Sequence, residues 1–332
     1  MGSIWMRTFG AVMVAGCLLA ASAVAQVGGD PGGDPGALPE GVEILENGPG
    51  SFGVSLPDGT CCDDRDLRSV QIDDLTIDIR ETTTGLDVEY RVYAPGDAHY
   101  GNARFRVVPG SPASKELQLW WSEAAKGKNI RKNITVTLFK SDKSAGRTYN
   151  LHDCFPVSFT LADSTSDLAD VLVVSMQGVD LLAADDADAG ILAAGMRGLY
   201  ATVRDPGAAP LVTALWRSWR GGEVAIFPRG QFTDSQFHTT TPGHKYVDTI
   251  TLRGPMTSSR KSLCTWINDT VNGKPWKRSI TVTEITRDGG SAKRYNYFDC
   301  FPVRYVFPRM SVDPAVTLKE EVSVKPIRVE LR

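Results

Sequence analysis

The chain has 332 residues, of which 42% are hydrophobic, 23% charged and 8% aromatic. These proportions are typical of globular proteins and exclude both wholesale disorder and a collagen-like fibre. At roughly 150 residues per domain, the length predicts two domains. The formal net charge is -3 and no basic stripe is present, which excludes a generic nucleic-acid binder.

The N-terminus predicts a secretory signal peptide over residues 1–25. An apolar stretch at residues 11–21 is followed by Ala23-Val24-Ala25, which forms an A-x-A cleavage site. Residues 14–17 also resemble a lipobox, which would make Cys17 a lipidated anchor. The apolar run continues past Cys17 to the A-x-A site, and this favours cleavage after Ala25. Both interpretations predict export to the periplasm or the extracellular space.

The mature chain is predicted to begin with a flexible linker over residues 26–58. Its first part reads GGDPGGDPG at residues 28–36, and glycine and proline stay dense beyond it. Such a segment lacks the apolar content to offset its conformational entropy. The linker is predicted to hold the folded part away from the export site, or to be a spacer without further function.

A tandem repeat organises the rest of the chain. Short motifs recur without gaps at one offset of 146 positions, as from Ile134 to Ile280. The repeated motifs are Ile-Thr-Val-Thr at 134–137 and 280–283, and Asp-Cys-Phe-Pro-Val at 153–157 and 299–303. The sequence therefore predicts two copies of one domain, at 59–182 and 192–332, joined by an Ala/Asp/Gly linker at 183–191.

Each copy predicts many strands and a single helix, in the same order. Alternating apolar residues predict strands at 86–93, at 103–108 with its counterpart 249–253, and at 134–138. Leu117 and Trp120 lie at helical spacing after Ser114, the expected cap. A hairpin at 141–146 leads into a strand at 149–154, the Phe-Pro-Val segment bends, and a final strand follows at 171–176 or 322–329. The predicted fold is mainly β, a barrel or sandwich with a packed helix.

Two tryptophans and two Phe-Pro pairs are predicted to anchor the two cores. Trp120 and Trp266 occupy equivalent helical positions, each with an apolar neighbour three residues earlier. The Phe-Pro pairs also occupy equivalent positions, Phe155-Pro156 and Phe301-Pro302.

No catalytic constellation is present in the sequence. The nucleophile-elbow, phosphate-loop and dinucleotide-binding motifs are all absent. The four histidines are scattered, and none forms a pair at metal-ligand spacing. The sequence therefore predicts a protein that is not an enzyme and that needs neither a cofactor nor a metal.

Five cysteines remain after the signal peptide, in a compartment that permits disulfides. We expect Cys264 to pair with Cys300, and Cys61 or Cys62 to pair with Cys154. The odd count leaves one thiol free or paired between chains. The alternative is that all five are small buried apolar side chains.

The order and spacing of these motifs resemble the contractile-phage, T4-like tail-tube protein family. The resemblance rests on Tyr100-Gly-Asn-Ala-Arg-Phe105, the Trp-Trp helix, the Ile-Thr-Val strand and the Phe-Pro-Val segment. It covers both copies and implies β-barrels that assemble into hexameric rings, which stack as a hollow tube. Two features depart from the family: the signal peptide, and two domains in one chain.

The resemblance implies a structural subunit that assembles with itself outside the cytoplasm. If each barrel fills one of six places in a ring, three two-barrel chains close a pseudo-hexamer with threefold symmetry. The alternative is a monomeric exported binding module that kept the fold without assembly. A secreted enzyme is the third and least supported hypothesis, because no catalytic constellation appears.

Overall fold

The structure is a computed structural model that describes residues 43–56, 61–62, 65–82, 91–162, 168–183, 198–204, 210–216, 218–232, 238–258, 260–274, 276–285 and 291–331. The predicted signal peptide lies outside these residues, as does the linker predicted at 183–191 except for Ala183. Below, the first copy denotes the elements up to Ala183 and the second copy those from Gly198 onward.

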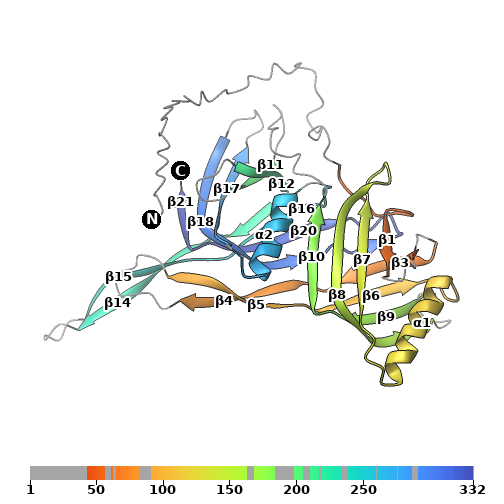
Figure 1. Cartoon of the computed structure of the whole chain (residues 1–332). Coiled ribbons are helices and arrows are strands. Elements are labelled where there is room, and N and C mark those ends of the chain that lie inside the picture. Colours follow the sequence, from red (N-terminus) through yellow and green to blue (C-terminus); the bar gives the residue numbers. More distant parts are fainter. Residues whose placement is uncertain are drawn as a thin grey trace, which may run out of the picture. The chain divides into compact units, whose positions relative to one another are not determined.

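The first copy contributes ten strands and one helix to the described chain (Figure 1). They are β1 (Phe52–Ser55), β2 (Cys61–Cys62), β3 (Leu67–Ile72), β4 (Leu75–Thr82), β5 (Val92–His99), β6 (Asn102–Val107), α1 (Pro112–Ala125), β7 (Lys132–Phe139), β8 (Ala145–Thr160), β9 (Asp170–Ser175) and β10 (Gly178–Ala183).

The second copy contributes eleven strands and one helix to the described chain. They are β11 (Gly198–Arg204), β12 (Pro210–Trp216), β13 (Ser218–Gly221), β14 (Val224–Phe232), β15 (His238–Val247), β16 (Ile250–Pro255), α2 (Lys261–Val271), β17 (Arg278–Ile285), β18 (Ser291–Val306), β19 (Met310–Ser311), β20 (Lys319–Lys325) and β21 (Arg328–Leu331).

Both copies follow the same antiparallel path. Strands of the first copy pair in the order β3-β6-β9-β8-β7-β1-β2, with β10 also on β8. Strands of the second copy pair in the order β13-β16-β20-β18-β17-β11-β12, with β21 also on β18. The prediction of a mainly β, barrel-like fold in tandem, with one helix in each copy, is confirmed.

The repeated Asp-Cys-Phe-Pro motif makes the corner of each barrel. Up to Cys154, β8 pairs with β7 and β10, and from Phe155 onward it pairs with β9. Asp153 (φ 50°) and Asp299 (φ 53°) both adopt the left-handed conformation, which aspartate tolerates better than most residues. The register then shifts past Pro156 and Pro302, where no backbone N–H is available for a ladder hydrogen bond. The motif therefore carries one long strand from one sheet segment to the next.

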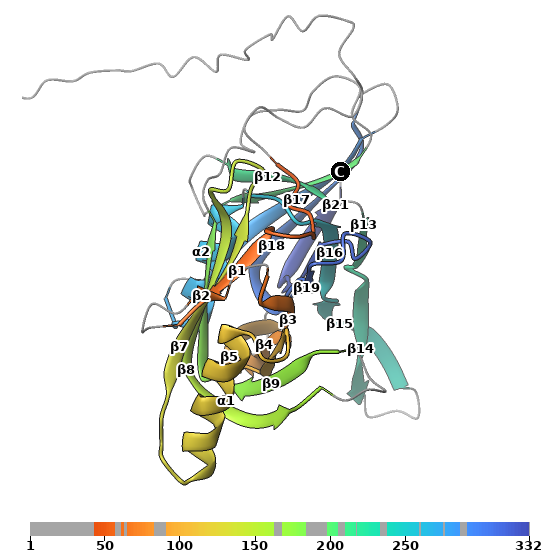
Figure 2. The same ribbon diagram turned by 90° about the vertical axis from the view of Figure 1, so that its right-hand side faces the viewer.

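Helix α1 packs on its own barrel, whereas α2 lies between strands β12 and β18 of its own copy and strand β10 of the first copy. Helix α1 contacts β8 and β9 (Figure 2), and it buries Leu117 and Trp120. Its N-cap is Ser111, not Ser114 as expected, because Pro112 occupies the first turn and the Ser111 side chain accepts from the Ser114 N–H at 3.1 Å. Helix α2 begins after Arg260, a left-handed residue (φ 80°) whose side chain makes no cap hydrogen bond.

Each copy also carries a two-stranded hairpin, β4–β5 in the first and β14–β15 in the second. Both hairpins extend to the same side of the view in Figure 1. Each contains one register shift at the equivalent place, between Ile77 and Ile79 and between Ile226 and Pro228. This shared irregularity aligns Leu75 with Val224.

Two expectations need correction, and a third lies mostly outside the described residues. The segment predicted as linker at 26–58 contains β1, because Phe52, Val54 and Leu56 alternate with exposed or half-buried residues and are buried. The strand predicted at 322–329 is two strands, β20 and β21, with Pro326 between them. Of the strand predicted at 86–93, residues 86–90 lie outside the described residues, and β5 begins at Val92.

Candidate functional site: the contact between the two copies

Strands from one copy extend the sheets of the other. Strand β4 of the first copy pairs with β18 of the second, where Leu75 faces Tyr305 and Thr76 faces Arg304. Strand β19 of the second copy pairs with β3 of the first through Met310 and Val70. The two copies therefore share main-chain hydrogen-bonded edges, which a flexible tether between independent domains would not produce.

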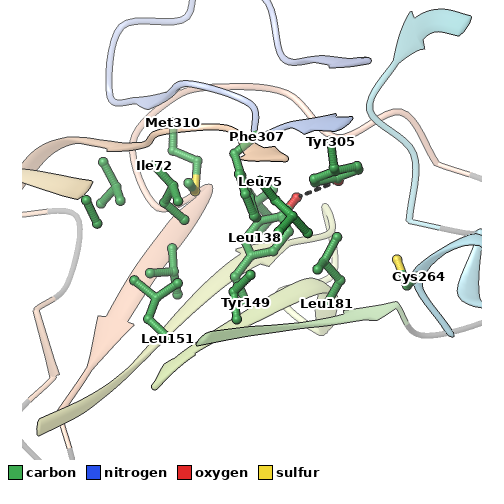
Figure 3. Close-up of a cluster of buried hydrophobic side chains, with 14 of the residues drawn as sticks. Ile72, Leu75, Leu138, Tyr149, Leu151, Leu181, Cys264, Tyr305, Phe307 and Met310 are labelled. Atoms are coloured by element: carbon green, nitrogen blue, oxygen red, sulfur yellow. Dashed lines mark hydrogen bonds between the residues drawn. The ribbon is translucent and has the colours of Figure 1, made fainter. Parts of the chain in front are cut away.

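An apolar cluster fills the space between these shared edges (Figure 3). The ring of Phe307 packs edge-on against Tyr149 of the first copy at 5.3 Å and against Tyr305 at 5.0 Å. Leu75 of the first copy is 1% exposed, as are both tyrosines. This cluster is continuous with the cores of both copies, so the contact is built like a protein interior.

The N-terminal arm of the first copy, residues 43–48, lies along the second copy. The Leu45 N–H donates to the Met256 carbonyl at 2.9 Å. The Asn47 side-chain amide donates to the carbonyls of Arg309 and Val316, and its oxygen accepts from the Ser311 N–H. Asn47 is 6% exposed, so these hydrogen bonds are shielded from water.

A buried ion cluster lies beside the apolar cluster. Glu320 of β20 accepts from Arg260 and from the Tyr305 hydroxyl at 2.9 Å, and it lies 3.6 Å from Nη2 of Arg147 in β8. Arg147 donates through Nε to the Thr257 carbonyl at 2.8 Å and through Nη1 to Cys264 at 2.6 Å. None of the Arg147 or Glu320 side chain is exposed. An arginine of the first copy thus neutralises a carboxylate of the second.

Burial and the two guanidiniums set the protonation of this cluster. Burial by itself would raise the pKa of Glu320, but Arg147 and Arg260 hold that pKa below its ordinary value. Burial raises the pKa of Cys264 to about 11, against the opposing effect of Arg147. Burial also raises the pKa of Tyr149 and of Tyr305. At neutral pH the cluster therefore holds one carboxylate, two guanidiniums and neutral hydroxyl and thiol groups.

The first copy has different residues at the positions equivalent to Arg260 and Glu320. The strand registers align Asp170 with Glu320, and the repeat offset aligns Ser114 with Arg260. In the first copy, the Ser114 hydroxyl donates to the Asp170 carboxylate at 2.5 Å. The helix and the strand are therefore joined by a hydroxyl–carboxylate hydrogen bond in the first copy and by an ion pair between longer side chains in the second, where the carboxylate also lies near Arg147.

A buried lysine connects the two hairpins. The Lys325 ammonium lies 3.7 Å from the ring centroid of Tyr246 in β15 and 4.6 Å from that of Tyr93 in β5. It donates to the Val247 carbonyl at 2.5 Å and is 1% exposed. Burial lowers the pKa of Lys325 to about 8, with a smaller opposing effect from Asp248. The two tyrosine faces partly compensate for the lost hydration.

The predicted core anchors lie outside this contact, in the barrels themselves. Trp120 and Trp266 are 2% and 0% exposed, and their indole nitrogens donate to the carbonyls of Ile130 and Trp276, which are also equivalent positions. Phe301 is buried and Phe155 is half-buried, while Pro156 and Pro302 are both buried at the corners.

The predicted disulfides are not formed among the described thiols. Cys154, Cys264 and Cys300 are free and buried. Cys264 faces Arg147 between the copies, whereas Cys300 lies at the corner of its barrel, so the members of the expected Cys264–Cys300 pair occupy different environments. Burial raises the pKa of Cys154 to about 12 and that of Cys300 as well, which keeps both as unreactive thiols. The side chains of Cys61 and Cys62 lie outside the described residues.

The described residues contain no cluster of histidine, cysteine, aspartate or glutamate that could hold a metal ion. In the same part of the chain, no helix is long and apolar enough to span a membrane.

A family model matches both copies of this chain. The T4-like virus tail tube protein gp19 model aligns with residues 50–182 and 224–327, which is more than half of the sequence. The chain belongs to this tail tube family. The first match begins within the segment that holds β1, in keeping with the place of that strand in the barrel.

Solved structures of contractile systems are similar to part of this tail tube family member. A chain of the PVC sheath–tube complex of an extracellular contractile injection system, in its extended state, is 18% identical, with 43% of this chain and 94% of that chain covered at a TM-score of 0.35. A chain of the anti-feeding prophage cap, which terminates its tube, is 16% identical, with 43% and 93% covered at a TM-score of 0.34. Hcp1 from Flavobacterium johnsoniae is 15% identical, with 39% and 93% covered at a TM-score of 0.25. With scores this low, family membership stands on the sequence match. No curated protein matches the chain.

Sequence reasoning missed the residues that join the copies. Arg147, Arg260 and Glu320 carry no motif, and the chain separates them widely. A signal was nevertheless present, because Arg260 replaces Ser114 of the first copy. A charged residue at the start of a buried helix needs an opposite charge nearby, because burying an unpaired charge costs free energy.

Proposed function

We propose that this chain is an exported, non-enzymatic structural subunit that assembles with copies of itself into rings or tubes. The tail tube family is structural, and both copies retain its motifs. Three chains supply six barrel places in one closed ring, which gives threefold symmetry and a pseudo-hexamer.

The observation that carries this proposal is the contact between the copies. It joins two different surfaces, the β18–β19 side of one barrel and the β3–β4 side of its neighbour. When a repeated unit binds its neighbour through two unlike surfaces, each end of the pair still offers one free surface to a further unit. Such a head-to-tail series closes into a ring when the rotation between neighbouring units divides a full turn. The chain thus already holds one step of such an assembly.

The proposed export rests on the apolar segment and A-x-A site at the N-terminus. Mass spectrometry of the protein recovered from its native compartment tests it. We expect a mature chain that begins at Gln26. A chain beginning at Met1, or at a lipidated Cys17, would contradict cleavage after Ala25.

Size-exclusion chromatography with light scattering tests assembly of the mature chain. We expect a species of several chain masses that grows with concentration. A strict monomer at micromolar concentration would contradict the proposal and favour the monomeric binding module.

A further inference from the structure

We propose that the chain carries an unfilled copy of its own internal contact, and that a second copy of the chain fills it. In this contact, the end of β8 in one chain pairs with the start of β14 in the next. The inference rests on the proposed function, and it names the surfaces through which assembly proceeds.

The first of these surfaces is the end of β8, which corresponds to the end of β18. Phe159 faces Leu172 across β8–β9, as Tyr305 faces Val322 across β18–β20. Ser158 therefore corresponds to Arg304, and Leu161 to Phe307. In the second copy this surface is covered by the first copy through β4 and Tyr149.

Exposure shows that the equivalent surface of the first copy is uncovered. Phe307 is 6% exposed, whereas Leu161 is 61% exposed, and Val157 beside it is 55% exposed. Among the described strands, only β9 pairs with β8 beyond Cys154, so the other edge of that segment has no described partner. An open strand edge flanked by apolar side chains favours pairing with another strand.

The second surface is the start of β14, which corresponds to the start of β4. The shared register shift aligns Leu75 with Val224 and Asp74 with Glu223. Leu75 is 1% exposed under Tyr305, whereas Val224 is 39% exposed. In the described chain, β14 pairs only with β15, while β4 pairs with both β5 and β18. The edge of β14 that corresponds to the β18-facing edge of β4 therefore has no described partner.

The two open surfaces complement each other as the two filled ones do. In the filled contact, Leu75 faces Tyr305, and Asp74 accepts from Arg304 at 2.5 Å and 2.8 Å. By correspondence, Val224 faces Phe159 of the next chain. Glu223 then lies diagonally from Ser158, as Asp74 does from Arg304, and the Ser158 hydroxyl can donate to its carboxylate. Each chain then offers one surface forward and one backward, as a ring requires.

Two substitutions test this contact, with mass photometry of the mature protein across a concentration series as the readout. Leu161→Arg places a charge on the docking surface and should convert assemblies to single chains, with the thermal midpoint unchanged because Leu161 is exposed. Leu119→Arg is the matched control, since Leu119 is also exposed, at 56%, and belongs to α1 and not to either of the two strands proposed to pair. It should assemble like the wild type.

A gain of assembly gives the sharper test. Ser158→Arg recreates opposite Glu223 the pair that Arg304 makes with Asp74, so half-assembly should occur at a several-fold lower concentration. Adding Glu223→Lys to Ser158→Arg should remove that gain.

The outcomes separate the contact from assembly itself. If the wild type assembles and both Leu161→Arg and Ser158→Arg assemble like it, this contact is wrong and the proposed function stands. If the wild type never assembles, the proposed function falls, and the inference falls with it.

Discussion

Glu320 has no exposed side-chain surface, and it accepts from Arg260 while lying 3.6 Å from Arg147. Removing charges from water costs several kcal/mol per ion, so a buried pair of this kind adds little net stability compared with apolar residues of the same size. Its loss is costly all the same, because two guanidiniums would stay buried without a counter-charge. We therefore expect the cluster to favour correct docking of the two copies more than it adds to stability.

The substitution Glu320→Gln tests this account of the cluster. We expect the free energy of unfolding to fall by about 3–5 kcal/mol, since both arginines lose their carboxylate. Glu123→Gln is the control, because its pairs with Lys126 and Lys128 lie at the surface, where ion pairs contribute little to stability. Urea unfolding measures both. Equal losses for the two variants would show that the buried cluster has no special role.

Lys325 makes stability depend on pH in the alkaline range. Its pKa is about 8 in the folded chain, against an ordinary value of 10.5, so the unfolded chain binds more protons between these two values. The free energy of unfolding should therefore rise as the pH passes through 8. The buried tyrosines and cysteines oppose this rise at higher pH, because their pKa values are raised above the ordinary 10.0 and 9.0.

Comparison with Lys325→Met between pH 7 and 9 isolates the lysine, because both proteins share the linkage from their cysteines. Wild-type protein should gain stability across it relative to Lys325→Met, as measured by urea unfolding at each pH. Parallel pH profiles for the two proteins would mean that Lys325 is charged in the folded state throughout this range.

Trp266 is fully buried and Trp120 nearly so, and each donates to a carbonyl at an equivalent position. Trp266→Ala and Trp120→Ala should each lower the free energy of unfolding by about 3–5 kcal/mol, partly through the cavity left behind. Leu119→Ala, at an exposed position on α1, should stay within about 0.5 kcal/mol of the wild type. An unchanged thermal midpoint for Trp266→Ala would contradict its place in the core.

At the scale of elements, the N-terminal arm adds a further contact between the copies beside the paired strands β4–β18 and β3–β19. Asn47 alone connects the arm to Arg309, Ser311 and Val316 through three hydrogen bonds. Because Asn47 is buried, water cannot readily replace its amide at those backbone groups, so the arm behaves as a structural strap.

Asn47→Ala should therefore lower the free energy of unfolding by about 2–3 kcal/mol, since unsatisfied buried polar groups cost about 1–3 kcal/mol each. Asn133→Ala is the control, because its exposed side chain makes one described hydrogen bond, to the Asp153 N–H. Thermal unfolding of the two variants measures the difference. A larger loss for Asn133→Ala would contradict a strap at the arm.

The repeated strands and corners could be predicted from sequence because they rest on local patterns. Ile-Thr-Val-Thr alternates with period two, and the Asp-Cys-Phe-Pro motif combines a left-handed aspartate with a proline that cannot continue the ladder. Strand β1 was missed because its three alternating apolar residues follow a run dense in glycine and proline. The start of α1 was predicted at Ser114, but the N-cap is Ser111. Pro112 was the better signal, because proline is favoured in the first turn of a helix.

The contact between the copies could not be predicted in this way. Arg147 and Glu320 meet only because β8 and β20 are brought together by the docking of whole barrels. No periodicity links such positions, and the repeat predicted two like domains without saying that they share strands. The prediction of a Cys264–Cys300 disulfide was wrong for the same reason, since it rested on chain position and not on distance in space.

For the whole molecule, duplication changes what assembly requires. In the proposed ring, one of every two barrel contacts would already be formed inside the chain, and the covalent link would remove the need for those two barrels to meet by diffusion. Only the contact between Leu161 and the start of β14 would then form between chains. The duplicated subunit should accordingly close a ring from half as many pieces as a single-barrel subunit.

The stoichiometry of the assembled mature protein tests this account most directly, by native mass spectrometry together with negative-stain imaging. The account predicts closed rings of three chains, with six barrel places around a central hole. Single chains at micromolar concentration, or closed rings built from six chains, would contradict it.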